Sequence, residues 1–201
     1  MVWFKKKQPI EYIIYSAIIV LGIFLDQLTK FLVNKYMDLY ESIPLIKDFL
    51  HLTYTTNKGA AFGMMEDQRW IFIVISTVTI IGFMVYHYLG HAENMLYGSA
   101  IALVVSGGIG NMIDRLGFGF YVNKDGMGEV IDFIDFCGIW KAIFNGADSF
   151  VCVGAGLLVL ALIIDLIKEY KAEKAGKALK AEEQNAESDT EGSAISHEDA
   201  E

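Results

Sequence analysis

Four long apolar runs constrain this chain more than any other feature of its sequence. They are Ile10–Leu28, Trp70–Leu89, Met95–Ile113 and Phe150–Ile167. Each approaches the roughly 20 residues that an α-helix needs to cross a bilayer. The first run is too long for a cleaved signal peptide, although Lys5–Lys7 precede it, and no small-residue cleavage pattern follows. We therefore predict a mostly α membrane protein with four transmembrane helices.

The lysines at the two ends of the chain predict its orientation. Lys5–Lys7 precede the first run, and a series of five follows the last: Lys168, Lys171, Lys174, Lys177 and Lys180. Cytoplasmic flanks of membrane helices are enriched in Lys and Arg. Both termini are therefore expected in the cytoplasm, which agrees with an even number of spans. The loop between the first two runs also contains lysines, so this orientation depends on the two ends.

This topology brings acidic residues together at the outer membrane boundary. Asp26, Asp114 and Asp148 lie at the outward ends of the first, third and fourth runs, and Asp132 and Asp135 fall in the outer loop between the third and fourth. A carboxylate at such a boundary is costly unless it is neutral, paired or hydrated. We expect these acids to form a functional site near the outer face.

The outer segment between the first two spans, residues 38–68, lacks a helical pattern. It contains Pro44, the β-prone stretch His51–Thr56, and the pair Gly59 and Gly63. These residues favour short strands and turns. We predict a small extracytoplasmic β-layer there, whose edge would accept an extended peptide by strand addition.

Charge separates the body of the chain from its C-terminal end. The formal net charge is −9, but residues 181–201 hold eight acidic residues and no Lys or Arg, so the remainder is near neutral. No basic stripe interleaved with aromatic residues indicates a nucleic-acid partner. We divide the chain into a four-span membrane domain, residues 1–170, and a charged, disordered cytoplasmic tail, residues 171–201.

The outer acids favour acid–base chemistry by a carboxylate pair. Two aspartates within hydrogen-bond reach share a proton, so one activates water while the other polarises a carbonyl. Asp148 is the strongest candidate, and the residues alone leave Asp132 and Asp135 open as its partner. Asp114 precedes Arg115, and this pair is better suited to holding a scaffold or a substrate carbonyl. Such chemistry needs no metal and no cofactor.

Two other functions fit parts of this pattern. In a magnesium-dependent lipid transferase, Asp132 and Asp135 would be the metal ligands. In a small ion-coupled transporter, the acids would line a path through the bilayer. The acids instead gather at one predicted face, which argues against transport.

Five motifs, each at a predicted outer boundary, carry a family resemblance. They are Asp26-Gln-Leu-Thr-Lys30, Thr56-Asn-Lys-Gly-Ala-Ala-Phe-Gly63, Gly107-Gly-Ile-Gly-Asn-Met-Ile-Asp-Arg115, Val130-Ile-Asp-Phe-Ile134 and Phe144-Asn-Gly-Ala-Asp148. In this order, over residues 10–168, the chain resembles the lipoprotein signal peptidases (signal peptidase II), which are aspartyl proteases of the bacterial cytoplasmic membrane.

The resemblance implies a reaction, a substrate and roles for residues. The family cleaves signal peptides from prolipoproteins just before a cysteine that carries a diacylglyceryl group, which stays in the membrane lipid. It implies a catalytic dyad of Asp132 and Asp148. The other implied residues are Asn57, Asn111, Arg115 and Asn145 for substrate binding, and Asp26, Lys30 and Asp114 for site support. We expect a monomer, because nothing in the sequence requires a second copy.

One interval departs from the family pattern. The family usually connects the third and fourth motifs with fewer residues than lie here between Arg115 and Val130. The extra Asn123-Lys-Asp-Gly126 is typical of a turn. We predict a hairpin-like excursion on the outer side.

Overall fold

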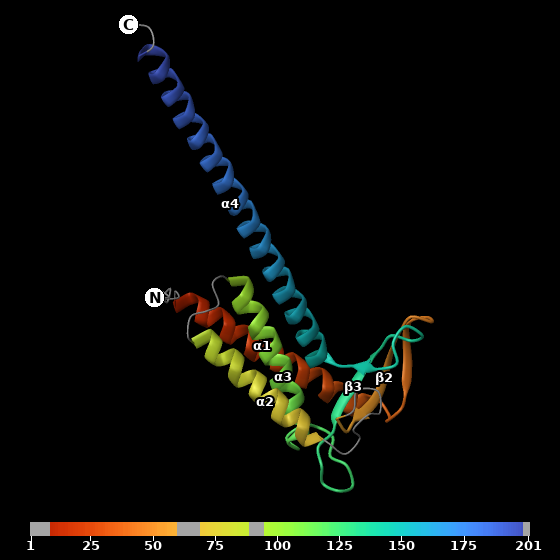
Figure 1. Ribbon diagram of the computed structural model, residues 1–201. Helices are drawn as coiled ribbons and strands as arrows, with labels where there is room; N and C mark the ends of the chain where they lie inside the picture. Colours follow the sequence, from red (N-terminus) through yellow and green to blue (C-terminus); the bar gives the residue numbers. More distant parts are fainter. Residues whose placement is uncertain (1–8, 60–68, 89–94, 199–201) are drawn as a thin grey trace. The chain divides into compact units, whose positions relative to one another are not determined.

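The computed structural model describes residues 9–59, 69–88 and 95–198, in four helices and four strands (Figure 1). In chain order these are α1 (Pro9–Tyr36), β1 (Ser42–Ile46), β2 (Leu50–Asn57), α2 (Arg69–Tyr88), α3 (Met95–Arg115), β3 (Val130–Asp135), β4 (Ile143–Phe144) and α4 (Gly146–Glu198). The chain divides into two compact units, Met1–Leu158 and Val159–Glu201. The first unit contains the sheet and the candidate site.

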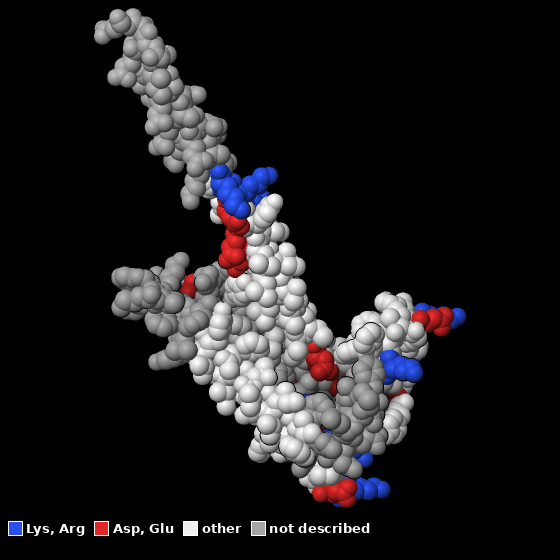
Figure 2. Space-filling model, in the orientation of Figure 1, with Lys and Arg blue, Asp and Glu red and all other residues white. Residues whose placement is uncertain are grey.

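Helices occupy all four predicted apolar runs, except that Leu89 lies outside the described residues. Within the described residues, three helical segments are long and apolar enough to cross a membrane: Ile10–Tyr36, Met95–Arg115 and Gly146–Lys177. A shorter apolar segment, Ile73–Tyr86, lies within α2. The mostly helical membrane fold is thus confirmed, with three clear spans and a shorter fourth candidate. On the face drawn in Figure 2, the described surface of the helices is largely uncharged.

Helix α3 packs closely against α1 and the start of α4. A Cβ added to Gly107 would collide with the carbonyl oxygen of Ala147, and one added to Gly110 would lie 2.5 Å from Asp26 Oδ2. Ala102 and Ser106, on the same face as Gly110, are buried. These small residues allow the backbone of α3 to approach its neighbours closely.

The sheet differs from the predicted β-layer in its composition. It is antiparallel, in the order β1-β2-β3-β4. The predicted strands between the first two spans are present as β1 and β2, but β3 and β4 come from the segment after α3, which the sequence indicated as a loop. Val130–Asp135 is rich in β-formers, and two aspartates obscure that pattern. Pairing with β2, where Thr55 lies opposite Asp132, decides its conformation.

A small apolar core fastens the sheet to the end of α1. Val33 of α1 packs with Tyr54 of β2 and with Ile131 and Phe133 of β3, and all four are buried. The Tyr54 hydroxyl donates to Asn34 Oδ1 at 2.6 Å. Burial raises the pKa of Tyr54 to about 12, so the hydroxyl keeps its proton. This core holds β3, and therefore Asp132, against the helices.

The predicted excursion between α3 and β3 is confirmed as hairpin-like. Val122 and Gly128 form an isolated antiparallel bridge. The turn between them is closed by Gly126 N donating to Asn123 O at 3.0 Å, and Asn123 Oδ1 accepts from the backbone N–H groups of Asp125 and Met127. Gly126 has a φ of 76°, a conformation that favours glycine.

Helical structure continues past the last apolar run. Helix α4 continues to Glu198, because Ala, Glu and Lys, which dominate residues 171–187, are strong helix formers. The two units meet at residues 158 and 159, within α4, whereas the sequence placed a boundary at 170. Membership of residues 171–201 in a cytoplasmic tail stays a prediction.

Candidate active site

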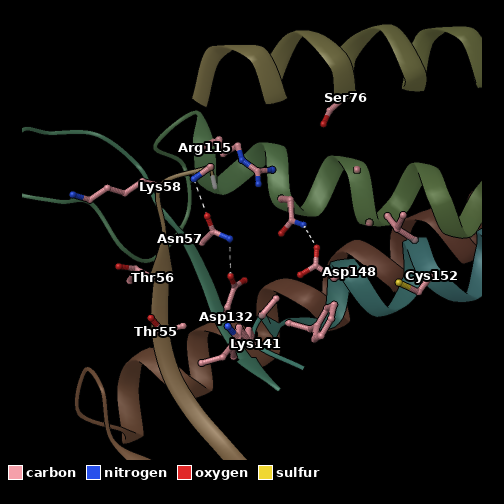
Figure 3. Close-up of a pocket in the computed structure, with 18 of the residues that line it drawn as sticks. Thr55, Thr56, Asn57, Lys58, Ser76, Arg115, Asp132, Lys141, Asp148 and Cys152 are labelled. Atoms are coloured by element: carbon pink, nitrogen blue, oxygen red, sulfur yellow. Dashed lines mark hydrogen bonds between the residues drawn. The ribbon is translucent and has the colours of Figure 1, made fainter. Parts of the chain in front are cut away.

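A cavity of about 1110 Å³ opens between the sheet and the helices in the first unit (Figure 3). Strand β2, helices α2, α3 and α4, and the segment around β4 all contribute to its lining. The polar lining residues include Thr55, Thr56, Asn57, Lys58, Ser76, Asn111, Arg115, Asp132, Lys141 and Asp148. The two aspartates of the predicted dyad therefore face one space.

Asp132 projects from β3 into this cavity and is bound by two amide groups. Asn57 Nδ2 donates to its Oδ2 at 3.0 Å, and Asn145 Nδ2 donates to its Oδ1 at 2.7 Å. The Asp132 residue is only 3% exposed. Each carboxyl oxygen therefore has a neutral donor, with little access to water other than through the cavity.

Asp148 lies in the first turn of α4 and forms a reciprocal cap with Asn145. Asp148 N donates to Asn145 Oδ1 at 3.0 Å, while Asn145 N donates to Asp148 Oδ2 at 3.2 Å. This is the capping-box arrangement of a helix N-terminus, where a negative charge is stabilised. Asn111 Nδ2 donates to the other oxygen, Oδ1, at 2.8 Å. Helix capping and a chemical role are therefore compatible in one side chain.

Asn145 links the two carboxyl groups. Its side-chain nitrogen donates to Asp132 Oδ1 at 2.7 Å and to Asn111 Oδ1 at 3.0 Å. Its backbone N donates to Asp148 Oδ2, and its side-chain oxygen accepts from Asp148 N. Asn145 is fully buried. One side chain thus fixes the end of β3 against the start of α4, which are sixteen residues apart at Asp132 and Asp148.

The surroundings of Asp132 favour its protonated form. Burial raises the pKa of its carboxyl group to about 7, and the nearby charge of Asp148 adds to the rise. The hydrogen bonds from Asn57 and Asn145, and the more distant charge of Lys30, oppose it. Near neutral pH, this carboxyl group is poised to hold or release a proton.

Behind the cavity, Lys30 forms a buried charged cluster with two other aspartates. Its Nζ lies 2.8 Å from Asp26 Oδ2, 2.6 Å from Asp114 Oδ2 and 2.9 Å from Asn111 Oδ1. The Lys30 and Asp26 side chains are 0% exposed, and that of Asp114 is 1% exposed. Lys30 thus makes hydrogen bonds to Asp26 and Asn111 and an ion pair with Asp114, so one buried cation serves two carboxylates.

This charged cluster also positions the start of α4. Asp26 Oδ1 accepts a hydrogen bond of 2.8 Å from Ala147 N, one of the N–H groups that has no partner within the helix. Asn111 joins the cluster to the cavity, because its Oδ1 accepts from Lys30 and its Nδ2 donates to Asp148. Asp26, Lys30 and Asp114 therefore support the site from outside the cavity.

Sequence reasoning missed Gln27 as a member of this cluster. Its Nε2 lies 3.2 Å from Asp26 Oδ2, Gly110 O and Asp114 Oδ1, so it bridges α1 and α3. The available signal was a second polar residue beside Asp26 in an apolar run.

Asp135 lies apart from the two cavity aspartates. It is three residues from Asp132 on β3, and residues an odd number apart face opposite sides of a strand. Its Oδ2 accepts from Thr53 Oγ1 at 2.8 Å, and it is absent from the cavity lining. The described residues contain no group of three or more His, Cys, Asp or Glu side chains placed to hold a metal ion.

Comparison with known proteins identifies the family. The peptidase A8 family model, described as signal peptidase (SPase) II, matches residues 18–164. A lipoprotein signal peptidase of Halalkalibacterium halodurans is 41% identical over 163 residues, covering 80% of this chain and 97% of the relative. Another, from Halothermothrix orenii, is 43% identical over 145 residues, covering 72% and 92%.

Solved structures agree with this result. One bacterial membrane enzyme, determined at 1.9 Å resolution, is 31% identical, with a TM-score of 0.66 over 80% of this chain and 97% of that one. A second is 32% identical, with a TM-score of 0.65 over 76% and 88%. The family match spans most of the sequence, and the fold is shared with membrane enzymes. This bacterial membrane protein therefore belongs to the signal peptidase II family of peptidases.

Proposed function

We propose that this chain removes signal peptides from diacylglyceryl-modified prolipoproteins, cleaving before the lipidated cysteine with Asp132 and Asp148 as an aspartyl dyad. The names of its relatives support the substrate class. The observation that carries the mechanism is that both carboxyl groups line one cavity and are linked by Asn145. Figure 3 shows them directed into the same space from β3 and α4.

The different environments assign a role to each aspartate. Asp148 accepts a backbone N–H and an amide at a helix N-terminus, a setting that stabilises a negative charge. It is the base that takes a proton from water. Asp132 has a pKa raised to about 7 by burial and by Asp148, and it is the acid that donates to the scissile carbonyl oxygen.

The proton steps then balance. Asp148 takes one proton from water, the hydroxyl oxygen bonds to the carbonyl carbon, and the proton of Asp132 passes to the carbonyl oxygen. In the second step Asp148 gives its proton to the leaving nitrogen and the C–N bond breaks. The diol proton returns to Asp132, so the dyad is restored.

The polar residues around the dyad have separable roles in this proposal. Asn57, Asn111 and Asn145 each donate a side-chain amide to a dyad carboxylate. We assign them to orienting the dyad in the absence of substrate. Arg115 lines the cavity from α3, and we assign it to a substrate backbone carbonyl. A buried peptide requires such partners for its polar groups.

The cavity matches a substrate that is part peptide and part lipid. Its polar end is formed by Thr55, Asn57 and the dyad, and it extends to residues within the helices, including Gly107, Gly108 and Val151. The peptide would lie at the sheet, beside the edge strand β4, while the diacylglyceryl group stays among the helices and lipid.

The same proposal includes membrane topology and oligomeric state. Both termini would be cytoplasmic and the dyad near the outer face, because Lys168, Lys171 and Lys174 follow the last apolar run and are exposed. Surrounding lipid would contact the exposed apolar side chains of α1 and α4. We also propose that the protein acts as a monomer, because nothing in the sequence requires a second copy.

Substitution of the three aspartates tests this mechanism. Asp132→Asn and Asp148→Asn should each lower cleavage of a diacylglyceryl-prolipoprotein by about a thousandfold or more, since dyad members act as a unit. Both variants should still insert and fold. Asp135→Asn is the matched control on the same strand and should retain activity. Cleavage by Asp132→Asn together with loss in Asp135→Asn would refute the assignment.

A chelator experiment separates the dyad from the magnesium-dependent alternative. The dyad mechanism predicts that wild-type cleavage is unchanged in excess EDTA. Loss of activity in EDTA that is restored by Mg²⁺ would favour a metal-dependent reaction instead.

A further inference from the structure

The excursion between α3 and β3 presents a row of bulky apolar side chains to its outside. Leu116, Phe118, Phe120 and Val122 recur at every second position, and Phe118 is 79% exposed. Between them, Gly119 and Tyr121 are less exposed, whereas Gly117 is exposed but has no side chain. We call the four exposed side chains the apolar ridge.

The opposite face of the excursion is held by the protein, so the ridge has a defined direction. Tyr121 packs against the core beneath the sheet. Asn123 Nδ2 donates to Glu129 Oε1 at 2.9 Å, and Glu129 is buried. A Cβ on Gly128 would collide with the Asp114 carbonyl oxygen. Rotating the ridge inward would break these contacts.

The ridge continues the apolar surface of the membrane helices. It starts at Leu116, directly after Arg115, where the α3 span ends. Phe120 packs on Phe31 of α1, with ring centroids 5.4 Å apart, and Asn34 Nδ2 donates to Phe120 O at 3.4 Å. Phe31 is itself exposed, as are its α1 neighbours Leu28 and Leu32. Figure 1 shows the excursion as the green loop near the ends of α2 and α3.

We propose that the apolar ridge inserts into the outer leaflet of the bilayer and anchors the sheet end of the molecule to the lipid surface. The occupant is lipid because the ridge is continuous with the exposed face of a spanning helix. Aromatic side chains are favoured at the boundary between hydrocarbon and headgroups. Lys124 and Asp125, at the turn, are exposed and would remain among headgroups and water.

The ridge is separate from the cleavage site. None of its four residues lines the cavity, so the anchor goes beyond the proposed reaction and does not depend on it. Its effect would be to set the height of the cavity relative to the bilayer, where a substrate tethered by its own lipid is confined.

Depth measurement on the full-length chain in phosphatidylethanolamine–phosphatidylglycerol nanodiscs tests the anchor. In a Cys137→Ser, Cys152→Ser background, a nitroxide is attached at Phe118→Cys or, as a second ridge position, Val122→Cys. Val20→Cys on the exposed face of α1 is the lipid reference, and Lys124→Cys is the water reference. The readout is collision with oxygen, which concentrates in lipid, relative to a water-soluble nickel chelate.

Each outcome decides the proposal. We expect the oxygen-to-nickel ratio at positions 118 and 122 to approach that at Val20 and to exceed that at Lys124 several-fold. A ratio equal to that at Lys124 would place the ridge in water and overturn the proposal. Protection from both reagents would show a protein contact, such as a second copy of the chain, and would overturn it as well. Neither result would bear on cleavage by the dyad.

Discussion

Two pairs of aspartates, of which Asp26, Asp114 and Asp132 are buried and Asp148 is partly buried, lie close together in different electrostatic settings. Asp26 and Asp114 share the ammonium group of Lys30. Asp132 and Asp148 are held by asparagine amides and one backbone N–H. A cation compensates charge, whereas neutral donors orient a carboxyl group and compensate it less. The first pair is therefore suited to structure, and the second is suited to keeping a movable proton.

Asn111 connects the two pairs without merging them. Its oxygen faces Lys30 and its nitrogen faces Asp148. An amide can hold the two groups in fixed positions relative to each other, but it cannot exchange a proton with either near neutral pH. The charged cluster can thus hold the dyad in place while the dyad changes its protonation.

Removing the cation should have the largest effect on stability. Lys30→Met leaves two buried carboxylates without their partner, and we expect a loss of about 3–5 kcal/mol in the free energy of unfolding. Thermal unfolding in detergent measures it. Lys35→Met, on the same helix but exposed, is the control and should change stability little. If Lys30→Met changes the free energy of unfolding as little as Lys35→Met does, the charged cluster does not stabilise the fold.

Protonation of Asp132 should make the stability of the protein depend on pH. Asp132 has a folded-state pKa of about 7 against a reference of 3.8. Its protonation contributes stability in full below pH 3.8, and that contribution is lost as pH rises to about 7. The change is at most about 1.4 kcal/mol per pH unit. Asp132→Asn, which cannot ionise, should therefore gain stability relative to wild type across this window.

Unfolding of both proteins at several pH values measures that difference. Val153→Ala, an exposed apolar position on α4, is a control and should follow the wild-type pH dependence. A difference between wild type and Asp132→Asn that stays constant from pH 4 to about 7 would show that Asp132 is charged throughout, and the contrast between the two pairs would fail.

The smallest effect is expected outside both pairs. The two aspartate pairs lie before residue 159, in the first unit. Deleting residues 181–201 should therefore leave cleavage of a lipidated substrate unchanged. Activity of the purified, stably inserted truncation measures this. Loss of catalysis in that protein would mean that the C-terminal residues act on the dyad or on substrate entry.

Much of the site was predictable because its polar residues occur where apolar runs end. A buried charge in a membrane helix needs a partner, so Asp26 and Asp114 were recognisable from their positions at the ends of apolar runs. Lys30 was identified through the family resemblance. Choosing Asp132 over Asp135 needed the family resemblance. Strand alternation, which supplies the physical reason, was hidden while Val130–Asp135 was interpreted as a loop.

Other features depended on contacts between distant segments. The polar side chain of Gln27 beside Asp26 was a local signal, but its bridge from α1 to α3 depends on how the two helices pack. The pairing of β2 with β3 joins residues more than seventy positions apart, such as Thr55 and Asp132, and no local propensity determines such a register.

By itself, the sequence determined the membrane helices, the excursion and the identity of the groups available for chemistry, because hydrophobic length, turn residues and charge are local properties. Only the tertiary structure decided how those groups are used. It joined two segments between helices into one sheet, buried Lys30 between two aspartates, and placed Asn145 between Asp132 and Asp148. Burial and hydrogen bonding set the proton affinity of a carboxyl group, and both depend on which distant residues the fold brings together.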